Sequence, residues 1–176
     1  MSITIPAPRG IDAAGRESVW WVPALANPAA PTVAEITAGI NLSCALYGFE
    51  TSVDQPTTTT AHLCDVQPVQ RPGRATYSVG TLVVDDDPQR TDSTGNYKYL
   101  EVIVPGAQGY LVRRRGLLAK RDAAVVAAQY VDVIPADIGT LNRVSLDPTS
   151  TDGGTLRNEY TVFVTGQVKH DVKVIA

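Results

Sequence analysis

The chain has 176 residues, of which 44% are hydrophobic and 19% are charged, and its formal net charge is −3. A chain of this length fits one domain and can bury a core without disulfides or metals. The mildly acidic balance excludes broad electrostatic binding to duplex nucleic acid, which requires a basic surface. No stretch has the pattern of a signal peptide or the roughly 18–20 apolar residues of a membrane helix, so we expect synthesis in the cytosol and no membrane partner.

The first part of the chain is predicted to be an extended arm over residues 1–17, because prolines and glycines there interrupt regular structure. A β-branched and aromatic strand is expected at residues 18–22, ending near Pro23. Residues 18–176 are then predicted to form a single β domain.

A short helix is predicted after this strand. Thr32 and Glu35 have the spacing of a capping box, in which each side chain bonds a backbone N–H of the other residue. Gly39 and nearby β-branched residues limit this helix to about two turns. A strand over residues 40–47 is expected to follow.

The middle of the chain is predicted to contain a polar loop and a hairpin. Residues 48–61 form the loop, which exceeds the usual length of about two to six residues and is therefore either functional or mobile. Residues 62–86 contain two apolar runs broken by prolines and are expected to form one or two hairpin arms. Asp85, Asp86 and Asp87 end the second run, and a solvated strand exit explains them better than a cation site, since the spaced ligands of a calcium loop are missing.

The only substantial helix is predicted between about residues 92 and 105, where apolar residues recur at helical spacing before Pro105. These apolar residues are Tyr97, Leu100, Ile103 and Val104. Strands are expected over residues 109–115 and 123–134, and Pro135 is predicted to end the second of them.

The last strand is the clearest element in the sequence. Apolar residues alternate with polar ones from Tyr160 to Val174, as in a strand with one buried and one solvated face, and Gly166 marks a bulge or bend. The chain is therefore predicted to contain about seven strands and one or two short helices. This defines a mainly β fold, either a β-sandwich or a partly open barrel with a flanking short α-helix.

Residues for catalysis or metal binding do not form a recognisable pattern. The sequence has no Gly-x-Ser-x-Gly, Walker A or Gly-x-Gly-x-x-Gly element. His62 and His170 lie in predicted strands without metal-ligand spacing, and Cys44 and Cys64 are expected to be reduced core residues. We therefore predict no catalytic, cofactor-binding or metal-binding residues, no cofactor and no enzymatic activity.

A basic cluster occurs at Arg113, Arg114 and Arg115. On a strand, Arg113 and Arg115 share one face and Arg114 points to the other. Contact with an acidic neighbouring subunit and simple solvation explain the cluster equally well, and contact with a phosphate backbone explains it less well.

Four segments occur in an order that matches a known family. The first consists of Val19–Pro23, Pro31–Ile36 with Gly39, and Leu42 and Leu46. The other three are Pro105–Gly116, Val131–Pro135 and Asn158–Asp171. Together they resemble the tail tube (major tail) proteins of long-tailed bacteriophages, particularly phages of actinobacterial hosts. The resemblance covers nearly the whole chain.

The resemblance implies a structural virion protein, assembled in the host cytoplasm, that forms stacked hexameric rings of the tail tube. The implied partners are further copies of the chain, the tape-measure protein, and terminator and initiator components, with DNA passing through without sequence-specific binding. Joining strands around a ring would also cover the unpaired edges of a β domain. The competing interpretation is a β-sandwich virion decoration or ligand-binding module.

In such a tube, one polar strand face is expected to line the bore, because small neutral or acidic groups give phosphates no anchor. The candidates are Thr161, Thr165 and Gln167, or alternatively Thr76 and Ser78. The arm at residues 1–17 and the loop at 48–61 are predicted contacts between rings, since binding would offset the entropy lost when they become ordered.

Overall fold

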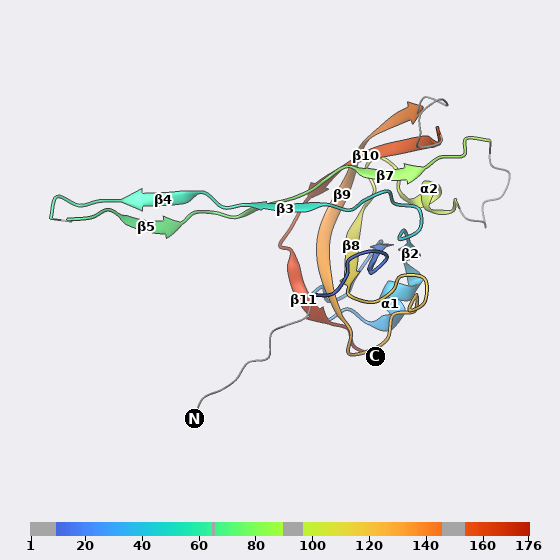
Figure 1. Cartoon of the computed structure of the whole chain (residues 1–176), viewed down its shortest axis with the longest axis horizontal. Coiled ribbons are helices and arrows are strands. Elements are labelled where there is room, and N and C mark those ends of the chain that lie inside the picture. Colours follow the sequence, from blue (N-terminus) through green and yellow to red (C-terminus); the bar gives the residue numbers. More distant parts are fainter. Residues whose placement is uncertain (1–9, 65, 90–96, 146–153) are drawn as a thin grey trace.

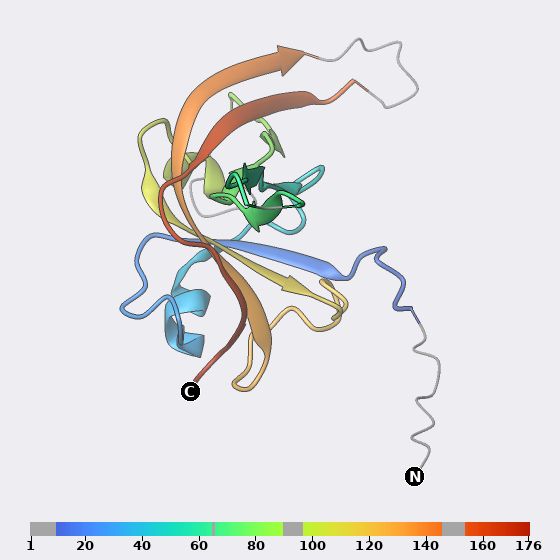
Figure 2. The same cartoon turned by 90° about the vertical axis from the view of Figure 1, so that its left-hand side faces the viewer.

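The computed structural model describes residues 10–64, 66–89, 97–145 and 154–176. In these ranges the chain forms one strongly curled sheet, two short helices and a long two-stranded ribbon (Figures 1 and 2). The mainly β prediction is confirmed, and the curled sheet matches the partly open barrel. In sheet order its strands are β2 (Ile40–Asn41), β1 (Glu17–Val22), β8 (Gln108–Arg115), β9 (Tyr130–Ser145), β10 (Leu156–Val164) and β7 (Leu82–Asp85), with β11 (Lys169–Lys173) beside β9.

Strand β9 holds the two halves of the sheet together. Its first half pairs with β8 and β11, and its second half pairs with β10 (Figure 2). The prediction of a strand over residues 123–134 was wrong at both ends, since β9 begins at Tyr130 and continues through Pro135. Pro135 is tolerated because it lies opposite the interruption between β10 and β11, where its carbonyl accepts a bond from Thr165 N at 3.1 Å and no ladder donor is needed.

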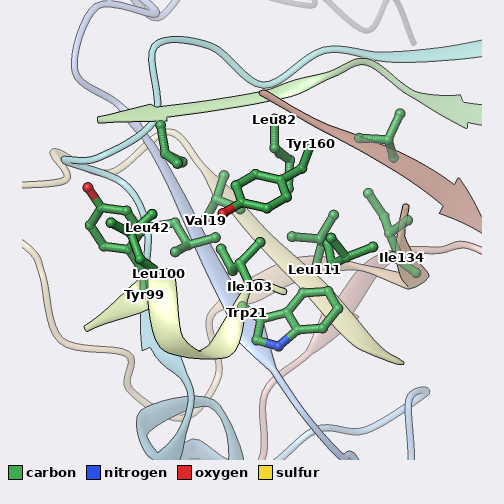
Figure 3. Close-up of a cluster of buried hydrophobic side chains, with 14 of the residues drawn as sticks. Val19, Trp21, Leu42, Leu82, Tyr99, Leu100, Ile103, Leu111, Ile134 and Tyr160 are labelled. Carbon is green, nitrogen blue, oxygen red and sulfur yellow. The ribbon is translucent and has the colours of Figure 1, made fainter. Parts of the chain in front are cut away.

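The sheet buries both faces in the half that contains β1. Val19 and Trp21 point into a first core, shown in Figure 3, together with Leu111, Leu82 and Tyr160. Trp20 and Val22 point into a second core under helix α1 (Val33–Ala38). Burial on both faces explains why Val19 to Val22 of β1 form an uninterrupted apolar run instead of an alternating pattern.

The capping box of α1 is confirmed. Thr32 Oγ1 accepts a hydrogen bond from Glu35 N at 3.2 Å, and Glu35 Oε2 accepts one from Thr32 N at 2.8 Å. The strand predicted after α1 was too long, because β2 stops at Asn41. The Asn41 side chain accepts a bond from Ser43 N at 2.9 Å, which turns the chain.

The helix predicted between residues 92 and 105 was also too long. Helix α2 (Tyr99–Val102) is a single turn, and residues 90–96 lie outside the described ranges. Its N-cap residue, Lys98, makes no side-chain capping bond, and β-branched Ile103 and Val104 before Pro105 oppose continuation. The turn is held by Tyr99, whose buried hydroxyl donates to Asp85 O at 2.9 Å.

Residues 48–61 form no polar loop, which corrects the prediction. They contain β3 (Thr51–Asp54) and β4 (Thr57–Thr60), which pair with β6 (Thr76–Val79) and β5 (Val69–Pro72). We call residues 51–79 the ribbon, β3 and β6 its root, and β4 and β5 with their connection its outer segment. The ribbon projects far from the rest of the protein, which we call the body (Figure 1). The hairpin predicted within residues 62–86 was therefore wrongly placed in the sequence, because the strands that pair with β5 and β6 lie earlier in the chain, in residues 51–60.

The alternation of the final segment is confirmed. Tyr160, Val168, Val172 and Val174 are buried, and the polar residues between them face outward or are partly covered. The chain leaves the ladder around Gly166, so the predicted single strand is divided into β10 and β11.

Candidate assembly surfaces

The described residues contain no group of three or more His, Cys, Asp or Glu side chains arranged to hold a metal. Cys44 and Cys64 are free thiols, and the expectation that they lie in the core was wrong, since both are exposed. Cys44 follows β2 in a surface turn and Cys64 lies on the ribbon connection, where no core exists to bury it. None of the helices in the described ranges is long and apolar enough to span a membrane.

A polar face covers the outside of β9 and β10. On the same side of the sheet, the second core and α1 cover the other half, so this half remains open to solvent. Thr161 and Thr165 of the predicted bore residues lie there, and Thr161 Oγ1 accepts a bond from Thr140 N at 2.8 Å. The residues that define the polar face are Gln108, Asp137, Thr140, Asn142, Glu159, Thr161 and Thr165.

The polar face contains one aromatic side chain. Phe163 is exposed and lies over Gly139, where a Cβ would collide with both Phe163 and Thr161. Gly139 lies at the register shift between Tyr160 and Val162, so glycine is required at this bulge.

The remaining bore candidates lie elsewhere. Gln167 is exposed in the turn between β10 and β11, where its Oε1 accepts a bond from Lys169 Nζ at 2.6 Å. Thr76 and Ser78 are on β6, and Ser78 Oγ lies 2.7 Å from Ser52 Oγ across the ribbon root. The side chains next to them on β6 pack into the first core, as Tyr160 does from β10, so this core separates the β6 pair from the polar face.

The three arginines of the basic cluster have three different environments. Arg114 is 1% exposed, and its guanidinium stacks on Trp20 with its carbon 5.1 Å from the ring centroid. It donates to Ser18 Oγ at 3.3 Å and to Gln129 Oε1 at 3.1 Å. It also donates to the carbonyls of Ala124 and Asp122. Burial lowers the pKa of Arg114, and the nearby charge of Asp122 opposes this shift.

Arg114 therefore fastens the loop after β8 from inside the protein and has no surface to offer a neighbour. Arg113 is also largely covered, with 15% of its side chain exposed and its Nε 2.5 Å from Glu17 Oε1. Arg115 has 58% of its side chain exposed and lies 3.5 Å from Asp132 Oδ2. Among the three, Arg115 is the arginine accessible to a neighbouring subunit. The predicted opposite orientation of Arg114 is confirmed.

The ribbon is the largest exposed feature. Every residue of β3, β4 and β5 is exposed, including the apolar Val53 and Val69. Leu63 and Val66, on the connection between β4 and β5, are fully exposed. The sequence contained a signal for this element, because the threonine run at residues 57–60 is β-branched throughout.

The described residues form a mainly β fold whose distinctive polar face and ribbon are exposed on the surface. The chain belongs to the phage tail tube protein family, whose model matches residues 5–176. It is accordingly a structural component of a tail and not an enzyme. No match was found among curated proteins.

Three solved structures share the fold. The PVC sheath/tube terminator of an extracellular contractile injection system is 14% identical, with a TM-score of 0.54 over 96% of this chain and 98% of that one. A chain of the PVC sheath-tube complex is 14% identical, with a TM-score of 0.55 over 93% and 94%. The tube-terminating cap of the anti-feeding prophage is 11% identical, with a TM-score of 0.51 over 97% and 95%.

Proposed function

We propose that this chain assembles into stacked hexameric rings that form the tail tube of a phage, the conduit through which DNA leaves the virion. Its partners are other copies of itself, the tape-measure protein within the tube, and terminator and initiator components at the two ends. The family and the fold shared with tube and terminator chains support this proposal. Assembly takes place in the host cytoplasm before the tail joins the virion.

The observation that carries the proposal is the ribbon. An isolated two-stranded hairpin is marginally stable in water, and the outer segment has no packing of its own. Exposed Leu63 and Val66 would remain in contact with water in a lone subunit. Packing between two rings would give the outer segment a partner and cover its apolar side chains, so the ribbon is the element that joins successive rings. The part of the predicted arm that precedes β1 is the second joining element.

Contacts within a ring involve the outer part of β9. Pairing between β9 and β8 ends at Asp137, and beyond Ile138 the described strands offer β9 only β10 as a partner. The free edge over residues 139–145 is therefore available to a strand of the next subunit, which would cover it as the ring closes. Within the basic cluster, the exposed Arg115 is the residue that we expect to form an ion pair with that subunit.

The polar face lines the bore in this proposal. Its Thr, Asn and Gln groups are neutral and its Asp137 and Glu159 are acidic, so these residues give phosphates no anchor. Arg157, a cation on the same face of β10, stacks on the Tyr47 ring with its guanidinium carbon 3.6 Å from the ring centroid. Thr161 and Thr165 belong to it, whereas Thr76, Ser78 and Gln167 are the alternatives that lie outside it.

The test is electron microscopy of the purified protein at high concentration, with and without tail initiator components as seeds. Wild-type protein is expected to form tubes. A variant in which Asn-Gly replaces residues 56–74 keeps the paired root, since an Asn-Gly turn closes a hairpin, and is expected to remain a folded monomer. Thr58→Ser serves as the control with a full-length ribbon and should polymerise.

Two results would contradict the proposal. A wild-type protein that stays monomeric under every condition would fit the decoration or ligand-binding alternative instead. A shortened variant that polymerises as well as wild type would show that the ribbon is not the joining element.

A further inference from the structure

We propose that Arg113 and His170 are positioning residues that hold the ribbon root in one fixed direction on the body. These two side chains contact the ribbon from the sheet below it, one beside each strand of the root. The link to tube formation rests on the function proposed above, whereas the fixed direction itself is a property of the single subunit.

Arg113 holds the side of the root that contains β3. Its Nη1 donates to Thr51 Oγ1 at 3.2 Å, and its guanidinium carbon lies 5.4 Å from the ring centroid of Phe49, just before β3. The guanidinium is itself fixed by Glu17, at 2.5 Å from Nε. Both atoms of this ion pair are shielded from solvent, and neither has a hydrogen bond elsewhere among the described residues.

His170 holds the side that contains β6. Its ring packs against Tyr77, with the centroids 5.7 Å apart. Below it, Asp132 Oδ1 lies 3.2 Å from His170 Nδ1 and accepts a bond from Asp171 N at 3.1 Å. The same carboxylate also reaches the exposed Arg115, and within this group Asp132 is the buried side chain that supports the imidazole.

The backbone around His170 is specially shaped. Asp171 is a non-glycine residue with a φ of 50°, and the register with β9 shifts between Lys169 and Val172. A β-bulge re-aims a side chain, and a non-glycine residue in the left-handed region is strained and persists only where its surroundings hold it. Here the bond from Asp171 N to Asp132 holds it, and the bulge directs His170 toward Tyr77.

A largely covered ion pair such as Arg113 with Glu17 is informative at this place, because apolar side chains of similar volume are often as stabilising as a buried ion pair. What charged and hydrogen-bonded groups add is direction, since an arginine fork bonds its partners at fixed angles. A cavity of about 30 Å³, bordered by Arg113, Asp132 and His170, remains between the root and the sheet beside the apolar contacts that Tyr77 and Val79 make with the first core.

A fixed root has a consequence for assembly. An arm that already points to its binding site loses less conformational freedom when it binds, which strengthens association. A fixed root therefore holds the outer segment in one orientation, so the outer segment loses less conformational entropy when it binds the next ring. Loss of either contact is expected to free the root while the body stays folded.

The experiment measures the distance between two spin labels on the monomer by pulsed electron paramagnetic resonance. One label is on the native exposed Cys44 of the body and the other on Asp54→Cys at the end of the root, with Cys64→Ser removing the third thiol. The parent should give a single narrow distance peak. The variant with Arg113→Ala and His170→Ala should lose that peak, and Arg115→Ala, which touches Asp132 but not the ribbon, should keep it.

A second route covers the case in which Arg113→Ala does not fold. Phe49→Leu with Thr51→Val removes the contacts of Arg113 from the ribbon side and leaves the Glu17 ion pair intact, and His170→Ala in the same protein removes the contact with Tyr77. A narrow peak that persists in both sets of variants would overturn the proposal, as would equal broadening by Arg115→Ala.

Tube formation is then measured on the same proteins. Variants with a freed root should polymerise more slowly than the parent. Arg115→Ala should polymerise at the parent rate, which would show that slower polymerisation comes from loss of the root contacts and not from loss of a positive charge. Freed variants that polymerise at the parent rate would overturn the link to assembly. A parent that forms no tubes would refute the proposed function, and the distance measurement would still decide the role of Arg113 and His170.

Discussion

The body and the ribbon use similar residues in opposite ways. In the body, the β-branched and aromatic residues of β1 pack into two cores, and each of these side chains is buried. In the ribbon, threonines and valines form equally regular strands, yet every residue of β3, β4 and β5 is exposed. β propensity is therefore sufficient to shape a strand, and burial decides whether that strand is stable alone.

The largest expected effect comes from removing a core side chain of the body. Trp21 is 1% exposed, and its ring packs so closely on Gly109 that a Cβ there would lie 2.8 Å from it. Trp21→Ala should lower the free energy of unfolding by about 3–5 kcal/mol, measured by urea denaturation. The matched ribbon variant Val69→Ala should change it by less than about 0.5 kcal/mol. Similar losses in both variants would erase the distinction between body and ribbon.

The next effect compares neighbouring arginines. Arg114→Met removes the charged donor from the carbonyls of Asp122 and Ala124 and should cost on the order of 2–3 kcal/mol in the same assay. Arg115→Met, at an exposed ion pair, should cost less than about 1 kcal/mol. The reverse order would show that Arg114 is not the residue that fastens this loop.

A smaller effect is expected at the single turn of α2. Tyr99→Phe removes the bond to Asp85 O and leaves that carbonyl with one partner fewer, at a cost of about 1 kcal/mol. Burial, followed by the charge of Asp85, raises the pKa of the Tyr99 hydroxyl, so it remains a neutral donor over the ordinary pH range. Tyr130→Phe, at an exposed tyrosine, is the control and should leave the urea midpoint unchanged.

The smallest effect is a pH dependence at the start of α1. Hydrogen bonds from Ala26 N, Thr32 N and the Thr32 hydroxyl lower the pKa of Glu35 below its ordinary 4.5. A lowered folded-state pKa means that this stabilisation is present above pH 4.5 and is lost as the pH falls through the folded value. Glu35→Gln should therefore lower the thermal unfolding midpoint at pH 7. It should have little effect on the midpoint at the most acidic pH values of the same series. An equal effect at both ends would exclude the carboxylate as the cause.

Much of the body was predictable from the sequence because its signals are local. The capping box at Thr32 and the alternation after Tyr160 each depend on residues close in the chain. The extension of β9 through Pro135 was missed, because proline is permitted there only by the gap between β10 and β11. That gap is a feature of the sheet and has no counterpart in the sequence near Pro135.

The assembly surfaces were harder to predict. Thr161 and Thr165 were chosen from the strand period and lie on the open polar face, whereas Gln167 falls where the strand is interrupted. The ribbon was mistaken for a loop because its polar, threonine-rich strands have no buried face and therefore no alternation. Arg114 was counted with the surface arginines, although its burial depends on Trp20 of the neighbouring strand and on the loop after β8.

The most direct test is hydrogen exchange compared between monomer and tube. Amides of β8 and of residues 130–138 of β9 should be protected in both states, because these residues lie in the packed body. Amides of β4 and β5 should exchange rapidly in the monomer and become protected in the tube, as the outer segment gains a partner. Exchange in β4 and β5 that is equally fast in monomer and tube would contradict the account and exclude the ribbon as the contact between rings.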